Sequence, residues 1–180
     1  MASMAVVTSV FAFEGAEQTL VDTIFKAKWG LNEEQSEQVI EKMRLANENP
    51  NYENLLNRLC AEAMNLKPAP LDGILWDDAL DAPVAEPLHH ILAENAHVRI
   101  LDLTMEPGEV ENYHTHKYAG IIMDIIPSDF TMQLQNKAEE IIFLPATGDP
   151  MFVHTEGLKP YSMTNVGANT YIGLHFEIKE

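Results

Sequence analysis

Residues 97–116 read HVRILDLTMEPGEVENYHTH, and the first part of this stretch alternates with a period of two. Alternate residues share one face of an extended chain, so Leu101, Leu103 and Met105 form an apolar face directed at a core. The opposite face is apolar only at its start. The stretch therefore predicts a β-strand over residues 97–105, which ends at the turn formed by Pro107-Gly108.

A pair of histidines follows this turn. His114 and His116 are separated by one residue, so on an extended strand both imidazoles project from the same face and can reach one ion. Neutral imidazole binds zinc, iron, copper and nickel. A His-x-His pair is a short motif, however, and a catalytic metal normally has three protein ligands. The pair predicts half of a transition-metal site.

The rest of the C-terminal half carries closely spaced turn signals, which are Pro127-Ser128-Asp129, Asn136-Lys137, Gly148-Asp149-Pro150 and Asn165-Val166-Gly167. About eight short strands fit between them, as in a small antiparallel barrel or jelly roll. The seven histidines all lie in or just before this half, at positions 89, 90, 97, 114, 116, 154 and 175. Any chemistry is therefore expected here.

The N-terminal half has a helical period instead. Apolar residues recur at spacings of three and four over residues 16–66, which predicts three amphipathic helices. Asn32 and Gln35 form a capping pair before the second helix, and Asn49-Pro50-Asn51 separates it from the third. Cys60 lies on the apolar stripe of the third helix, where a small buried hydrophobic residue is a simpler interpretation than a nucleophile. The proline-rich residues 67–87 predict a linker.

Composition narrows the function classes. The 180 residues, 46% of them hydrophobic, can form one domain with a core and a small appendage. The net charge of −17 argues against nucleic acid and anionic membrane surfaces as partners. The single cysteine excludes an intramolecular disulfide and a cysteine-based zinc cluster, and it favours the cytoplasm. The start, MASMAVVTSVFAFEGAEQ, has no basic residue before its apolar stretch and is too short to cross a bilayer.

The C-terminal half resembles the cupin superfamily. Gly108, His114 and His116 have the spacing of its first motif, in which a five-residue spacer separates a glycine from His-x-His. Residues 97–103 resemble the entry strand of small single-domain cupins, and residues 159–165, KPYSMTN, resemble the second motif. The resemblance implies a mainly β fold, a cupin-type antiparallel β-barrel (jelly roll) at residues 86–180. We expect the helical segment and linker at residues 1–85.

Two ligand positions depart from the family pattern. The motif glutamate would fall at Gly120 or Ile121, and Tyr161 stands four residues before Asn165, where the family has its third histidine. Other side chains must complete the site. We expect His175 to be a metal ligand beside the His-x-His pair, although its strand could turn it to the cavity or to solvent.

Two tyrosines are candidate catalytic residues. Tyr118 shares the parity of His114 and His116, and Tyr161 occupies the vacated histidine position. A core tyrosine that donates a hydrogen bond is the simpler interpretation of Tyr118. We expect His89 and His90 to be structural or solvated, and His154 to lie at the surface.

Three function classes remain. The first is a metal-dependent enzyme of dioxygenase, lyase or isomerase type, with Fe, Zn, Mn or Ni bound and a small organic substrate. The second is a non-catalytic protein that binds a small ligand in the same cavity. The third is a scaffold whose metal site has decayed, in which the helices serve a homodimer or another partner. The family resemblance does not choose among them, because fold does not determine function.

Overall fold

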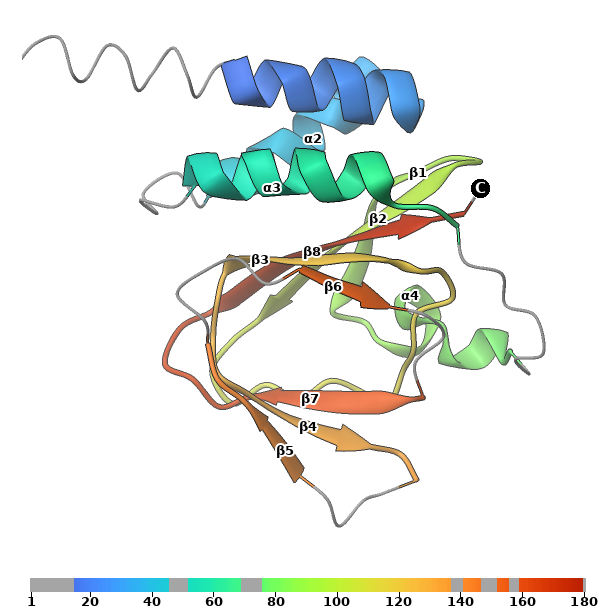
Figure 1. Ribbon diagram of the computed structural model, residues 1–180. Coiled ribbons are helices and arrows are strands. Elements are labelled where there is room, and N and C mark those ends of the chain that lie inside the picture. Colours follow the sequence, from blue (N-terminus) through green and yellow to red (C-terminus); the bar gives the residue numbers. More distant parts are fainter. Residues whose placement is uncertain are drawn as a thin grey trace, which may run out of the picture. The chain divides into compact units, whose positions relative to one another are not determined.

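The computed structural model describes residues 15–45, 52–68, 76–136, 141–146, 152–155 and 159–179. The chain divides into two compact units, residues 1–66 and residues 67–180 (Figure 1). The domain boundary expected between residues 85 and 86 stays a prediction. No helix among the described residues is long and apolar enough to cross a membrane.

The first unit contains the three predicted helices, η1 (Leu20–Lys28), α2 (Glu33–Arg44) and α3 (Tyr52–Asn65). The first of them has the hydrogen bonding of a π-helix. Each helix buries one apolar stripe, as its period predicts. Cys60 is half-buried and Met64 is exposed, so the stripe of α3 is narrower than expected. The innermost side chains are Leu20, Ile24, Phe25, Val39, Ile40, Met43, Leu55, Leu56 and Leu59.

Local polar contacts define the ends of these helices. The predicted capping pair is confirmed, because the Asn32 side chain accepts a hydrogen bond from the Gln35 amide and the Gln35 side chain accepts one from the Asn32 amide. At the far end of α3, the Lys28 ammonium donates to the carbonyl oxygens of Ala63, Met64 and Leu66. A cation there complements the helix dipole. The separator expected at residues 49–51 lies outside the described residues.

The second unit contains two antiparallel sheets (Figure 1). The five-stranded sheet has the order β1-β2-β8-β3-β6, and the three-stranded sheet has the order β5-β4-β7. The expected mainly β architecture is therefore present. The strands are β1 (His89–Glu94), β2 (Val98–Met105), β3 (Gly120–Ile126), β4 (Phe130–Leu134), β5 (Ile141–Leu144), β6 (Phe152–Thr155), β7 (Tyr161–Asn165) and β8 (Tyr171–Ile178).

The predicted strand is confirmed as β2, in which Leu101, Leu103 and Met105 are fully buried. Its other face is also buried, because β2 is an inner strand between β1 and β8. Two charged residues, Arg99 on the face of Leu101 and Asp102 on the opposite face, are only 5% and 7% exposed. Charged groups are seldom buried without partners, so this strand does more than fill a core.

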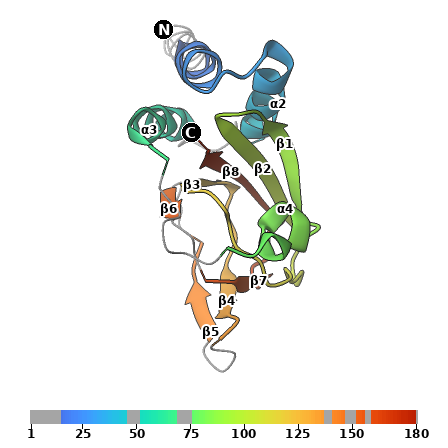
Figure 2. The ribbon, with the colours of Figure 1, turned by 90° about the vertical axis from the view of Figure 1, so that its right-hand side faces the viewer.

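Residues 78–85 differ from the expected linker. They form a short 3₁₀ turn, η2 (Asp78–Leu80), and a one-turn helix, α4 (Ala82–Ala85), which lies beside β1 (Figure 2). Pro83, one of the four prolines that suggested a linker, stands in the first turn of α4, where no backbone donor is needed. Two backbone hydrogen bonds join this segment to Thr115, the residue between the two motif histidines. Ala82 N donates to Thr115 O at 2.8 Å, and Thr115 N donates to Leu80 O at 2.7 Å.

The His-x-His pair lies in the connection between β2 and β3 rather than inside a continuous strand. This connection runs along β7, with His114 and Tyr161 exchanging backbone hydrogen bonds of 3.0 and 2.9 Å. Glu111 N likewise donates to Met163 O at 2.9 Å. The pair is thus held by the smaller sheet on one side and by residues 78–85 on the other.

Candidate metal centre

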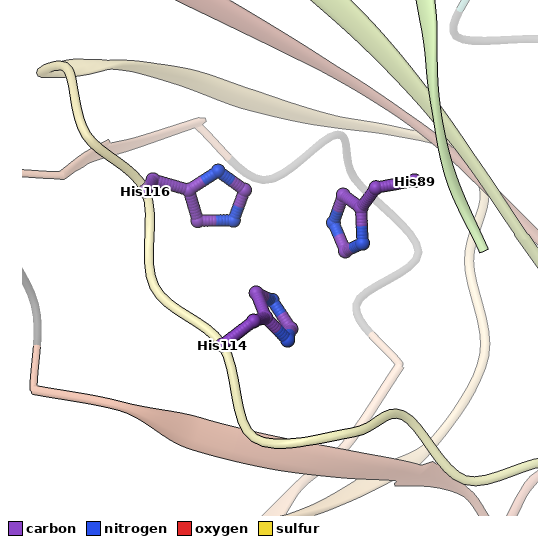
Figure 3. A group of neighbouring side chains, drawn as sticks. All are labelled: His89, His114 and His116. Carbon is purple, nitrogen blue, oxygen red and sulfur yellow. The ribbon is translucent and has the colours of Figure 1, made fainter. Parts of the chain in front are cut away.

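Three histidines from two distant segments meet inside the second unit (Figure 3). His89 is the first residue of β1, whereas His114 and His116 come from the connection before β3. Their exposed fractions are 3%, 0% and 1%. One ring nitrogen of each lies within 4.8 Å of those of the other two, so a single metal ion could be bound by all three.

Two further rings contact this group. The His175 ring, from β8, lies 4.7 Å from His116 and 5.1 Å from His89, measured between ring centroids. The Tyr161 ring, from β7, lies 4.7 Å from His114, and its hydroxyl oxygen is 3.1 Å from His116 Nε2. The structure therefore brings together four of the five residues predicted for the site, namely His114, His116, His175 and Tyr161.

The hydrogen-bond partners of the rings define which ring nitrogen of each histidine faces the site as an acceptor. His114 Nδ1 donates to the Asn112 carbonyl at 2.9 Å, and His116 Nδ1 donates to Glu177 Oε1 at 2.8 Å. Since a neutral imidazole carries one proton, each of these rings presents an Nε2 lone pair to the site. His114 Nε2, both nitrogens of His89 and both nitrogens of His175 are buried without a hydrogen-bond partner.

These unpartnered atoms fit a metal ion. A buried polar atom without a partner costs about 1–3 kcal/mol, and several such atoms converge here. A divalent ion would satisfy the nitrogens of His89 and His114 together. The donor set is nitrogen-rich, which suits zinc, iron and nickel better than magnesium or calcium.

Burial also sets the protonation state of the rings. It lowers the pKa of His89, His114, His116 and His175, because a protonated imidazole loses its hydration inside the protein. The pKa of His116 falls to about 3. The rings are therefore neutral at physiological pH, which is the form that binds metals. Burial raises the pKa of Tyr161 well above its ordinary value, so its hydroxyl stays protonated.

Glu111 and His89 are site residues that sequence reasoning missed. Glu111 is 2% exposed, and its Oε1 lies 3.8 Å from His89 Nδ1. Burial, with a contribution from nearby Glu86, raises the pKa of Glu111 to about 8, so it is a carboxylic acid at neutral pH. His89 had one signal in the sequence, since a His-His doublet at the start of a strand must direct one ring inward. The sequence did not show which.

The other candidates lie elsewhere. The Tyr118 ring stacks under the Arg99 guanidinium and near the Lys179 ammonium, at 5.2 and 5.8 Å from its centroid. Its catalytic role therefore stays a prediction, with no contact to the histidine group among the described residues. His90 has a side chain that is 71% exposed, and His97 is exposed. The side chain of His154 lies outside the described part of the chain.

Comparison with known proteins gives structural neighbours only. No known protein family matches the sequence, and no curated protein is similar to it in sequence. Among solved structures, a cupin domain from Bordetella pertussis Tohama I shares 11% identity, covering 51% of this chain and 92% of that one, with a TM-score of 0.45. A Klebsiella pneumoniae protein with a double-stranded β-helix domain shares 14% identity, covering 62% and 88%, with a TM-score of 0.40.

A third neighbour is the DMSP lyase DddQ from Ruegeria pomeroyi, with 15% identity, coverage of 76% of this chain and 71% of that one, and a TM-score of 0.36. The chain is thus similar to solved cupin structures, the class that its motif spacing resembles.

Proposed function

We propose that the second unit is a metal-binding, cupin-like domain in which His89, His114 and His116 hold one divalent transition-metal ion. The observation that carries this proposal is the convergence of three buried, neutral imidazoles. His89 and His114 have ring nitrogens without a hydrogen-bond partner, and His116 Nε2 has only the Tyr161 hydroxyl, at 3.1 Å. Fe, Zn, Mn and Ni are the candidate ions. His175 is proposed as a further ligand, since its unpartnered ring contacts two of the three.

The fold proposal follows from the same group. We infer that the two sheets are the halves of a jelly-roll barrel that occupies residues 86–180. Its interior would be the space around the histidines, because His89 and His175 come from the larger sheet while His114 pairs with β7 of the smaller one. A barrel of this kind encloses a site for a small organic ligand.

An enzyme is favoured over a decayed scaffold. When bound, the ion would act as a Lewis acid toward a small organic substrate. The Tyr161 hydroxyl lies 3.1 Å from His116 Nε2, and its raised pKa makes it a hydrogen-bond donor rather than a base. A scaffold would gain nothing from several buried polar atoms without partners, each of which opposes folding. Dioxygenase, lyase and isomerase chemistry all remain within this proposal, as does ligand binding without turnover.

Metal stoichiometry tests the proposal directly. We expect the metal-free wild type to bind one equivalent of zinc by isothermal titration, and His89→Ala, His114→Ala and His116→Ala each to lose stoichiometric binding with an unchanged circular dichroism spectrum. His90→Ala is the matched control, because that ring is adjacent but exposed. Equal metal content in the wild type and in the His114→Ala/His116→Ala double variant would overturn the proposal.

Turnover separates the enzyme from the binder. The metal-loaded wild type would be incubated with a panel of small carbonyl and carboxylate compounds, and products would be followed by NMR. Conversion of one compound that is lost in His116→Ala supports the enzyme. Saturable binding without conversion of any compound supports the alternative, a ligand-binding protein.

A further inference from the structure

A chain of buried charged groups leads away from His116. Glu177, on β8, is 2% exposed and accepts from His116 Nδ1 through Oε1 at 2.8 Å. Its other oxygen accepts from Arg99 Nε. The two remaining guanidinium nitrogens of Arg99 donate to both oxygens of Asp81, at 2.6 and 2.8 Å. These four residues form what we name the His116 relay: Asp81, Arg99, Glu177 and His116.

We propose that Glu177, oriented by Arg99 and Asp81, is a positioning residue that keeps the His116 proton on Nδ1 and so directs the Nε2 lone pair toward the metal ion. The inference deepens the proposed function and rests on it. Each oxygen of Glu177 has a donor, one from His116 and one from Arg99. An arginine side chain can only donate, so the Arg99 contact favours a carboxylate that accepts at both oxygens.

The relay is built by the fold rather than by local sequence. Arg99 and Glu177 stand directly opposite each other in the β2–β8 pairing. The bidentate pair with Asp81 fixes the plane of the guanidinium, which aims its Nε at Glu177. Asp81 also precedes α4 and bridges to Thr115, the residue between the two motif histidines. The His116 relay therefore holds the His-x-His pair in two ways, through the His116 side chain and through the backbone of Thr115.

His114 provides an internal contrast. Its Nδ1 donates to the backbone carbonyl of Asn112, not to a carboxylate. A substitution at Glu177 should therefore alter the tautomer of His116 and leave that of His114 unchanged. A general loss of structure would change both.

Glu177→Gln is the decisive variant. An amide offers one oxygen, which Arg99 Nε needs, so its NH₂ group would turn toward His116 Nδ1. That nitrogen would then have to accept, and the proton would move to Nε2, where it blocks metal binding. Loss of such a carboxylate behind a histidine ligand lowers metal affinity by about 10- to 100-fold.

Two measurements test the relay. Long-range ¹H–¹⁵N NMR of the metal-free wild type should show His116 protonated on Nδ1. In metal-free Glu177→Gln the same experiment should show His116 protonated on Nε2. His114 should be protonated on Nδ1 in both proteins. Zinc titration should show affinity about 10- to 100-fold weaker in Glu177→Gln. Asp124→Asn is the matched control, since it also neutralises a partly buried carboxylate, one that accepts from Tyr171 at 2.7 Å. It should change neither result.

The outcomes separate the two proposals. A wild type that binds no zinc would overturn the proposed function, whatever tautomer NMR reports. A wild type that binds one zinc ion while His116 carries its proton on Nε2 would overturn the relay alone. Equal zinc affinity in the wild type and Glu177→Gln would also overturn the relay, and NMR of the wild type remains decisive if the variant fails to fold.

Discussion

Gly120 shows how single residues constrain this site. It is one of the two positions where the cupin motif would carry its glutamate, yet a Cβ added there would lie 2.1 Å from the carbonyl oxygen of Phe176. Strand β3 approaches β8 too closely at this point for any side chain. Packing of the two strands therefore excludes the glutamate from position 120.

Gly120→Ala should consequently destabilise the second unit by about 3 kcal/mol, since the backbone must shift to admit the methyl group. The free energy of unfolding would be measured by urea denaturation. Gly108→Ala is the control, because Gly108 has a φ of 84° but open space around it, and we expect that variant to lose only about 1 kcal/mol. Equal losses in the two variants would contradict the close approach of β3 and β8.

Tyr161 is the second residue at which the site departs from the family pattern. Its hydroxyl lies 3.1 Å from His116 Nε2, so position 161 directs its side chain at the histidine group. Tyr161→His should add an imidazole and tighten zinc binding roughly tenfold, since a protonated phenol is a poor ligand. Tyr161→Phe removes the hydroxyl without adding a ligand, and it should not reproduce the gain. Unchanged or weaker zinc affinity in the histidine variant would mean that an imidazole at position 161 does not reach the ion.

At the scale of elements, the strand or turn that contains each site residue determines where its side chain points. The face of β8 that bears His175 and Glu177 is buried, which decides between the cavity and solvent orientations that the sequence left open. The segment Asp78–Ala85 is an element in its own right rather than a linker, because Asp81 pairs with Arg99 and the backbone pairs with Thr115.

The capping box of α2 yields a prediction for the helical unit. Asn32→Ala removes the side chain that accepts from the Gln35 amide at 2.8 Å, and it should lower the free energy of unfolding by about 1 kcal/mol. Asn57→Ala places the same change at an exposed position inside α3, where alanine favours the helix and the free energy should rise slightly. Thermal unfolding followed by circular dichroism would compare them. A shift of the same sign in both variants would show that capping does not limit the stability of α2.

At the scale of the whole molecule, the proposed metal ligands and the three N-terminal helices lie in different units. His89, His114 and His116 all fall within residues 67–180. We expect the helices to cover apolar surface on the second unit or on a second copy of the chain, because amphipathic stripes need a partner surface.

Deletion of residues 1–66 should therefore leave zinc stoichiometry unchanged while reducing solubility and producing aggregates in light scattering. The full chain would serve as the reference under identical conditions. A fragment as soluble and monodisperse as the whole protein would show that the helices have no covering role. Loss of zinc binding in a fragment that is still folded would mean that the helical unit supports the site.

The sequence by itself determined the features that depend on neighbours along the chain. The extended strand β2, the capping box of α2 and the approach of His114 and His116 to one point all follow from spacings of two to four residues. Tertiary structure alone decided the rest. Glu177 meets His116 across 61 residues and Arg99 across 78, and His89 reaches the motif from another strand. Such contacts depend on which strands pair and in which register, and that is set by packing of the whole unit rather than by any local pattern.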